Sequence, residues 1–195
     1  MARAETAALL LAAARGEFAE HGIAGARVDR IAQRAGVNKQ RIYAYFGDKE
    51  RLFQQVVTEA LGELGRSVPL DTGTDPAEYV RRVHEFHRDR PDLLRLLLWE
   101  SLHYGDRALP DEEGRAALYD DKVRVLSEAT GLPVERARPL LLTLIGMAAW
   151  PVIVPQLTRM TLGRNPGEEG ADEDLTDFLA GFARAALGPE EPGAR

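Results

Sequence analysis

The chain has 195 residues, of which 45% are hydrophobic and 29% are charged. This ordinary globular composition excludes a mainly disordered or fibrous protein. The chain contains no cysteine, which excludes a disulfide framework, a cysteine nucleophile and a cysteine-type zinc site. The first residues carry charges at Arg3 and Glu5 and lack the pattern of a signal peptide, so we expect a cytoplasmic protein.

The net charge of −6 is unevenly distributed along the chain. Residues 1–50 hold eight basic and six acidic side chains, whereas residues 51–195 hold 17 basic and 25 acidic ones. Residues 27–49 alone hold six basic side chains against two acidic ones. A local positive patch on an acidic body is typical of a protein that contacts a polyanion with one end only.

Helical patterns dominate the N-terminal quarter, and no segment alternates apolar and polar residues as a strand would. The first expected helix is Ala7–Phe18, and Gly22 is its expected left-handed cap. Val28–Ala35 is predicted to form a short second helix. A third helix is expected to begin at the capping residue Asn38 and to end at Gly47.

Longer helices are predicted for the remainder, which makes about nine helices in an all-α fold. They are expected from Asp48 to Leu64, from Pro76, from Pro91 through Trp99, and over Arg115–Thr130, Val134–Trp150 and Asp172–Leu187. Pro151 and Pro155 should kink or end the helix that begins at Val134. Residues 189–195 are predicted to be a frayed tail.

The segment Arg27–Phe53 carries the most informative pattern. Two short helices joined by a glycine-containing turn form a helix-turn-helix, whose second helix lies in the DNA major groove. Arginine and lysine suit guanine edges or phosphates, glutamine suits adenine, and tyrosine hydroxyls hold phosphates. The candidate DNA contacts are Arg27, Asn38, Lys39, Gln40, Arg41, Tyr43, Tyr45 and Lys49.

A composite pattern over about residues 4–60 resembles the TetR family of transcriptional regulators. It consists of Phe18-Ala19-Glu20-His21-Gly22, Ile31-Ala32, Ala35-Gly36-Val37, Ile42-Tyr43-Ala44-Tyr45-Phe46, Lys49-Glu50 and Leu52-Phe53. Two positions depart from the family pattern. Ala26 stands where the family usually has a capping Thr or Ser, so that cap is lost and Arg27 is left to supply the phosphate contact. Gln40 stands where glycine is common.

The resemblance implies a helix-turn-helix DNA-binding domain over residues 1–47 and a helical effector-binding and dimerisation domain over residues 48–195. The implied function is a ligand-responsive regulator, with a repressor favoured over an activator. A small, largely apolar or aromatic effector would release it from a pseudo-palindromic operator. The last two long helices would form a four-helix bundle in a homodimer. The expected interface residues are Leu140, Leu144, Leu175, Phe178, Leu179 and Phe182.

Aromatic and soft side chains concentrate in the second half of the chain. Core packing explains any one of them, and a ligand cavity walled by several is the alternative. The candidate pocket residues are Phe86, His87, Trp99, Glu100, His103, Tyr104, Tyr119, Met147 and Trp150. His87, Glu100 or His103 would be the polar anchors of such a pocket.

Several other patterns favour ordinary structural roles. Residues 139–158 are free of charge, but their prolines and Gln156 favour a helix in the core and at a subunit interface over a membrane span. His84 and His87 do not have zinc-site spacing, so no metal or cofactor is expected. The sequence has no nucleophile elbow or phosphate loop, so no catalytic residues are expected.

Two alternatives remain open on the residues alone. The chain could be a helical small-molecule-binding protein or enzyme whose N-terminal helices are only scaffold. It could instead bind DNA constitutively, without any effector.

Overall fold

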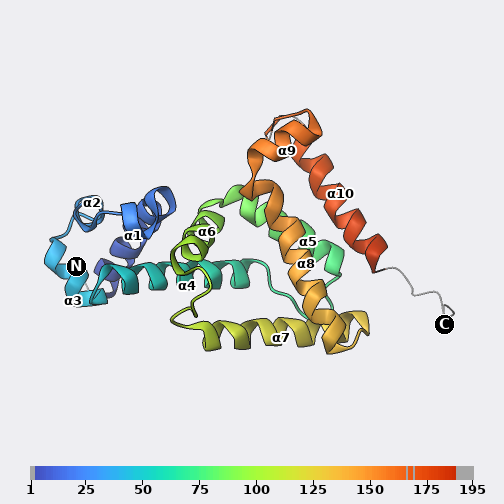
Figure 1. Cartoon of the computed structure of the whole chain (residues 1–195), viewed down its shortest axis with the longest axis horizontal. Helices are drawn as coiled ribbons and strands as arrows, with labels where there is room; N and C mark the ends of the chain where they lie inside the picture. The colour runs from blue at the N-terminus through green and yellow to red at the C-terminus, as the bar shows by residue number, and fades with distance from the viewer. Residues whose placement is uncertain (1–2, 166, 169, 188–195) are drawn as a thin grey trace. The chain divides into compact units, whose positions relative to one another are not determined.

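The computed structural model describes residues 3–165, 167–168 and 170–187, and the regular elements in these ranges are all helices (Figure 1). They are α1 (Arg3–Gly25), α2 (Val28–Arg34), α3 (Lys39–Phe46), α4 (Lys49–Ser67), α5 (Pro76–Asp89), α6 (Asp92–Tyr104), α7 (Glu112–Thr130), α8 (Val134–Ile153), α9 (Pro155–Leu162) and α10 (Ala171–Ala186). The predicted all-α fold is confirmed. The predicted tail over 189–195 lies outside the described residues.

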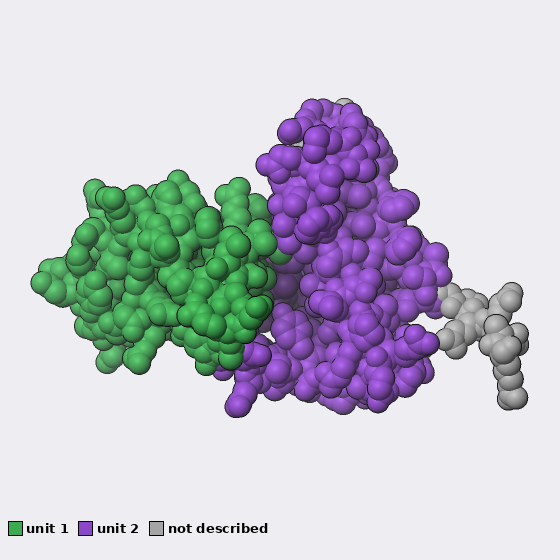
Figure 2. Space-filling model, viewed as in Figure 1, with its two compact units in different colours: residues 1–63, 90–110 green, residues 64–89, 111–195 purple. Residues whose placement is uncertain are grey.

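The helices group into two compact units, coloured separately in Figure 2. Unit 1 comprises residues 1–63 and 90–110, and unit 2 comprises residues 64–89 and 111–195. Unit 1 therefore contains α1–α3, most of α4 and the whole of α6. This grouping by packing is a different kind of division from the predicted functional boundary after residue 47, which stays a prediction.

Unit 1 is built around side chains from its helices that water does not reach. α1 packs on α6 and on α2, and α2 packs on α3. Phe18 and Phe53 are fully buried and meet edge to face, with ring centroids 5.1 Å apart. Ile31 and Ile42 are also fully buried. Since each such side chain contributes about 1.5–3 kcal/mol when buried, this core accounts for how the short α2 and α3 are held.

α1 is interrupted at Gly22, three residues before its end at Gly25. The Gly22 φ of +65° and ψ of −178° lie in a region that only glycine adopts readily, and they interrupt the helix between His21 and Ile23. The predicted left-handed cap at Gly22 is therefore wrong: φ is positive, but ψ is extended rather than left-handed helical, and α1 continues to Gly25. The indole of Trp99 on α6 covers this point and donates from Nε1 to the Ala19 carbonyl oxygen at 3.3 Å.

Unit 2 is organised around α5, which packs on both α8 and α10, while α7 packs on α8. Its buried core includes Val80, Leu126, Leu141 and Ala180. α8 continues three residues past the predicted end at Trp150 and includes Pro151.

The described residues form one helix more than the approximate count from the sequence, namely α9. Pro155 stands at its start, where a missing backbone N–H costs nothing, so this proline begins a helix as well as ending one.

Within the described residues, no single helix has the length and apolarity needed to cross a membrane. α8 and α9 meet those criteria only when taken together, and they are bent by 87° relative to each other. The same part of the chain holds no group of three or more His, Asp or Glu side chains arranged to bind a metal ion.

Substitution of Gly22 by alanine should destabilise unit 1. A Cβ atom there would lie 2.7 Å from the Trp99 ring, in addition to the strained φ. Strain of about 1–3 kcal/mol and overpacking of about 1–3 kcal/mol predict a clearly lower urea midpoint by circular dichroism. Gly65→Ala is the matched control, because that helical glycine faces open space, and it should stabilise by about 1 kcal/mol. Equal midpoints for wild type and Gly22→Ala would refute this assignment.

Candidate nucleic-acid interface

The helix α3 has one buried flank and one exposed flank. Ile42 and Phe46, one turn apart, are 0% and 7% exposed. Lys39, Gln40 and Arg41 are all exposed to solvent. An eight-residue helix thus presents long polar side chains outward while two apolar ones anchor it.

The two boundary residues that the sequence predicts, Asn38 and Gly47, define the ends of α3. Asn38 Oδ1 accepts from the backbone N–H of Gln40 at 3.0 Å, which confirms the expected N-cap. Gly47 has a φ of +82° and donates its N–H to the Tyr43 carbonyl oxygen at 2.9 Å. The exposed flank therefore extends over the two helical turns between Asn38 and Gly47.

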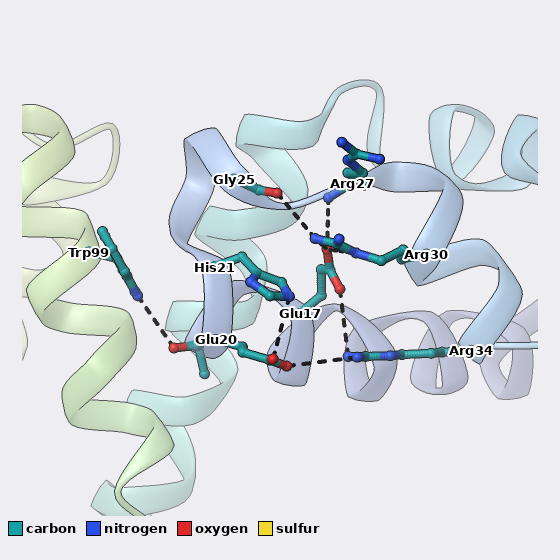
Figure 3. Close-up of polar contacts among 9 residues, drawn as sticks. Glu17, Glu20, His21, Gly25, Arg27, Arg30, Arg34 and Trp99 are labelled. Atoms are coloured by element: carbon teal, nitrogen blue, oxygen red, sulfur yellow. Dashed lines mark hydrogen bonds and ion pairs between the residues drawn. The ribbon is translucent and has the colours of Figure 1, made fainter.

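The start of α2 is held from α1 by a buried carboxylate, Glu17, which is 0% exposed (Figure 3). Glu17 Oε1 accepts from the backbone N–H of Arg27 at 2.8 Å and from Arg30 Nε at 2.7 Å. Arg27 is the N-cap residue of α2, and no side chain caps that helix locally. The expected loss of a local cap is correct, and Glu17 ties this helix start to α1 instead.

The Glu17 carboxylate sits among positive charges. Its Oε2 lies 3.6 Å from Arg34 Nη1, and Arg34 also lies 3.8 Å from Glu20. Burial raises the pKa of Glu17, but the hydrogen bonds from Arg30 and the Arg27 amide outweigh it and hold the pKa below its ordinary value. Glu17 is therefore a charged group at neutral pH, and its charge is compensated within unit 1.

Two lysines predicted to contact DNA already have partners in this structure. Lys39 Nζ lies 2.9 Å from Asp29 Oδ1, and this neighbour raises the pKa of Lys39. Both side chains are exposed, so water and salt screen the pair and it can open at little cost. Lys49 Nζ donates to the Ala26 carbonyl oxygen at 3.2 Å and thereby joins α4 to the chain before α2.

Arg27 and Arg41 differ from the other basic side chains of residues 27–49. Within that stretch, Arg30, Arg34, Lys39 and Lys49 each have a partner, whereas the guanidinium groups of Arg27 and Arg41 have none among the described residues. Both arginines are exposed. In Figure 3 the Arg27 guanidinium points away from Glu17, while Arg30 and Arg34 reach toward it. Among the basic residues of positions 27–49, these two arginines are therefore the ones most available to a phosphate or a base.

The two tyrosines predicted to bind DNA are placed differently. Tyr43 is 44% exposed on α3. Tyr45 is half-buried, and Arg3 of α1 lies over its ring at 5.6 Å from the centroid. Tyr43 is thus the more accessible of the two hydroxyl-bearing rings.

Comparison with known proteins identifies this arrangement. Residues 10–56 match the family model of bacterial regulatory proteins of the tetR family, and residues 75–177 match that of the tetracyclin repressor-like C-terminal domain. The chain is 41% identical over 183 residues to the HTH-type transcriptional repressor SCO4008 of Streptomyces coelicolor, which covers 92% of this chain and 93% of that protein. This chain belongs to the TetR family. It is therefore a DNA-binding transcriptional regulator and not an enzyme, which removes the scaffold-only alternative.

Solved structures of TetR-like regulators have the same fold. The transcriptional regulator SCO4942 of Streptomyces coelicolor is 30% identical, with a TM-score of 0.72 and coverage of 91% of this chain and 97% of that one. AibR, solved in complex with isovaleryl coenzyme A and operator DNA, is 16% identical, with a TM-score of 0.65 and coverage of 91% and 97%. At that identity, AibR supports the TetR-like fold alone.

The predicted effector-pocket residues of this TetR-family chain are divided between the two units. Unit 1 contains four of them, Trp99, Glu100, His103 and Tyr104, all on α6. Unit 2 contains the other five, Phe86, His87, Tyr119, Met147 and Trp150. A pocket formed by these residues remains a prediction.

The α6 residues of the predicted pocket have contacts inside unit 1. Tyr104 Oη donates to Glu50 Oε1 at 2.8 Å and accepts from Gln54 Nε2 at 3.2 Å, which joins α6 to α4. His103 Nε2 lies 3.7 Å from the same Glu50 carboxylate. Glu100 is buried, at 4% exposed. Tyr104 and His103 thus help to assemble the unit that carries α3.

The two α5 histidines of unit 2 are both buried. His84 Nδ1 lies 2.8 Å from the Ala148 carbonyl oxygen, so the His84 nitrogen carries the proton and donates. His87 is 2% exposed, and its Nδ1 has no hydrogen-bond partner among the described residues. Burial, with a smaller effect from His84, lowers the pKa of His87 to about 4. His87 is therefore a neutral ring with an unused polar atom at physiological pH.

The predicted dimer residues lie in three environments. Leu144 and Leu179 are buried in the core of unit 2, at 2% and 7% exposed, and Leu140 and Leu175 pack partly buried against it. Phe178 and Phe182 on α10 are 66% and 55% exposed and stack with centroids 6.4 Å apart. Leu142 on α8, 73% exposed, was not among the predicted residues. On α8 and α10, the exposed large apolar side chains thus include the two phenylalanines and Leu142, together with Val134 and Trp150 on α8.

Sequence analysis missed Glu17 as a site residue. A signal was present, since Glu17 follows Leu10 and Ala14 at helical spacing on the face that packs inward. An acidic residue on a buried face needs a cationic or N–H partner, and the nearby arginines of α2 supply both.

Proposed function

We propose that this chain is a homodimeric transcriptional repressor that places α3 in the major groove of a pseudo-palindromic operator and responds to a small effector. The exposed polar flank of α3, anchored by buried Ile42 and Phe46, is the observation that carries the proposal. The name of SCO4008, a transcriptional repressor 41% identical to this chain, supports repression over activation. A DNA-binding repressor acts in the cytoplasm, as the sequence also predicts.

In this proposal, some residues of each helix-turn-helix contact DNA phosphates and others contact base edges. Arg27 and Tyr43 hold phosphates, and Arg41 with Gln40 probes base edges from the middle of the exposed flank. Lys39 also contacts DNA once its ion pair with Asp29 opens. Solvent and salt screen this exposed pair, so DNA phosphates or bases can replace Asp29. Two such heads would read half-sites about 34 Å apart or somewhat more.

Loss of the Arg41 side chain tests this assignment. Arg41→Ala should weaken binding to DNA adjoining the protein's own gene by about 10- to 100-fold, because it removes a base or phosphate contact worth about 1–3 kcal/mol. Gel retardation at fixed salt measures the change. Arg66→Ala, at an exposed arginine near the end of α4, is the matched control and should leave affinity unchanged. Equal affinities for the two variants would remove Arg41 from the interface.

The proposed dimer uses α8 and α10. Exposed Phe178, Phe182 and Leu142 lie on these helices, and exposed apolar side chains of this size favour association. An isologous interface between the two helices of each subunit would bury them and fix the distance between the two DNA-binding heads.

A charge at Phe178 should separate the subunits. Phe178→Arg is expected to give monomers by size-exclusion chromatography with light scattering, because an unpaired buried charge is strongly unfavourable. Leu118→Arg on α7 is the matched control, since Leu118 is similarly exposed, at 64%, outside the proposed interface. Leu179 is a poorer site for this test, because it belongs to the core of its own subunit. A Phe178→Arg protein that remains a dimer would contradict the assignment.

The effector site is proposed to lie in unit 2, near His87. An enclosed neutral imidazole with an unused nitrogen, next to Phe86 at 5.8 Å between ring centroids, suits an uncharged or aromatic ligand that can hydrogen-bond. Effector binding would favour a conformer in which the two heads no longer match the half-sites. Such coupling is typically about 1–3 kcal/mol. A regulator without an effector remains the alternative, and ligand screens by thermal melting that find no stabilising compound would favour it.

A further inference from the structure

The contacts of Glu17 extend along α2, from its N-cap residue Arg27 to its last residue Arg34. This carboxylate is fully enclosed, yet it carries charge, and an enclosed carboxylate is retained only when donors surround it. Its donors are the Arg27 amide and Arg30 on one oxygen, with Arg34 nearby on the other. All three partners belong to α2 or its N-cap.

The arginine side chains of α2 and its N-cap differ in whether they point toward Glu17 or away from it. Arg30 is bound to Glu17 and also donates to the Gly25 carbonyl oxygen at 3.2 Å. Arg34 faces both Glu17 and Glu20. Arg27 is held only through its backbone, so its guanidinium remains outside the cluster (Figure 3).

The backbone bond matters because Arg27 is the N-cap residue of a short helix. α2 has seven residues and no side-chain cap of its own, so little local structure fixes the direction of the Arg27 side chain. Glu17 Oε1 supplies that constraint from α1, where the core around Phe18 holds the carboxylate in place.

We propose that Glu17 is a positioning residue for DNA binding, which holds the Arg27 backbone so that the Arg27 guanidinium meets a DNA phosphate. The proposal rests on the proposed function, since it requires that this protein bind DNA through its helix-turn-helix. Glu17 contacts no DNA itself and acts through Arg27.

The test compares two conservative variants. Glu17→Asp keeps the negative charge but shortens the side chain by one methylene, which removes the 2.8 Å contact with the Arg27 amide. Glu17→Gln keeps the reach and an acceptor oxygen but loses the charge. Each is measured as log affinity for operator DNA against log salt concentration. Affinity falls as salt rises, and the magnitude of this fall, called the salt slope here, grows by about 0.9 for each phosphate contact.

A positioning role predicts that Glu17→Asp lowers the salt slope by about one and weakens binding by about tenfold, as Arg27→Ala does. The double variant Glu17→Asp/Arg27→Ala should have the same salt slope as either single variant, because both substitutions remove the same phosphate contact of Arg27. Glu17→Gln should retain the wild-type slope, even if its urea midpoint falls. If Glu17→Asp does not fold, as judged by circular dichroism, a lowered slope for Glu17→Gln, whose acceptor oxygen still reaches the Arg27 amide, overturns the proposal.

Other outcomes overturn the proposal in distinguishable ways. An unchanged slope for Glu17→Asp, with a lowered slope for Arg27→Ala, assigns Glu17 a structural role only and leaves DNA binding intact. Equal loss in Glu17→Asp and Glu17→Gln, in proportion to their lower stability, likewise restricts Glu17 to a structural role. Wild-type protein that shows no salt-dependent DNA binding overturns the proposed function itself.

Discussion

The burial of Ile42 and Phe46 is the constraint on which the DNA-binding surface depends. An eight-residue helix is too short to be stable in water by itself, so packing has to hold it. These two side chains lie on one flank, at 0% and 7% exposed, and their position decides which residues face outward. Lys39, Gln40 and Arg41 are exposed because Ile42 is not. A rotation of α3 that exposed Ile42 would lose about 1.5–3 kcal/mol and turn the polar flank inward.

The charge of this surface is smaller than its composition indicates. Six basic residues lie within positions 27–49, but four of them are bound to carboxylates or to a backbone carbonyl of the same unit. Glu17 and Asp29 act in opposite ways. Glu17 is enclosed and holds α2 in place, whereas the pair between Asp29 and Lys39 is exposed and can be exchanged for DNA. Within residues 27–49, Arg27 and Arg41 are the two cations whose guanidinium groups have no partner in the described part of the chain, which suits a protein that reads a sequence rather than coating a polyanion.

The helices could be predicted from local residue chemistry, whereas the contacts between helices could not be predicted from it. The Asn38 cap and the end of α3 at Gly47 follow from residue type and spacing, and both occur in the structure. The partner of Glu17 could not be assigned, because its contact with Arg27 requires the angle between α1 and α2. The sequence also could not predict which apolar side chains of α10 are exposed to solvent. Phe178 and Leu179 are adjacent and both apolar, and only the packing of α10 on α5 places one outside and the other in the core.

Chemical mapping of the DNA beside α3 is the most direct test of the central claim that this flank enters the major groove. The chain has no cysteine, so one placed at exposed Gln40 can carry an iron chelate that cuts nearby DNA strands. The proposed arrangement predicts two symmetry-related clusters of cuts, about one helical turn or more apart, in DNA adjoining the protein's own gene. The same chelate at Leu118 on α7 should give no such clusters. A Gln40→Cys conjugate that binds this DNA yet cuts it no more selectively than the Leu118→Cys conjugate would contradict the claim.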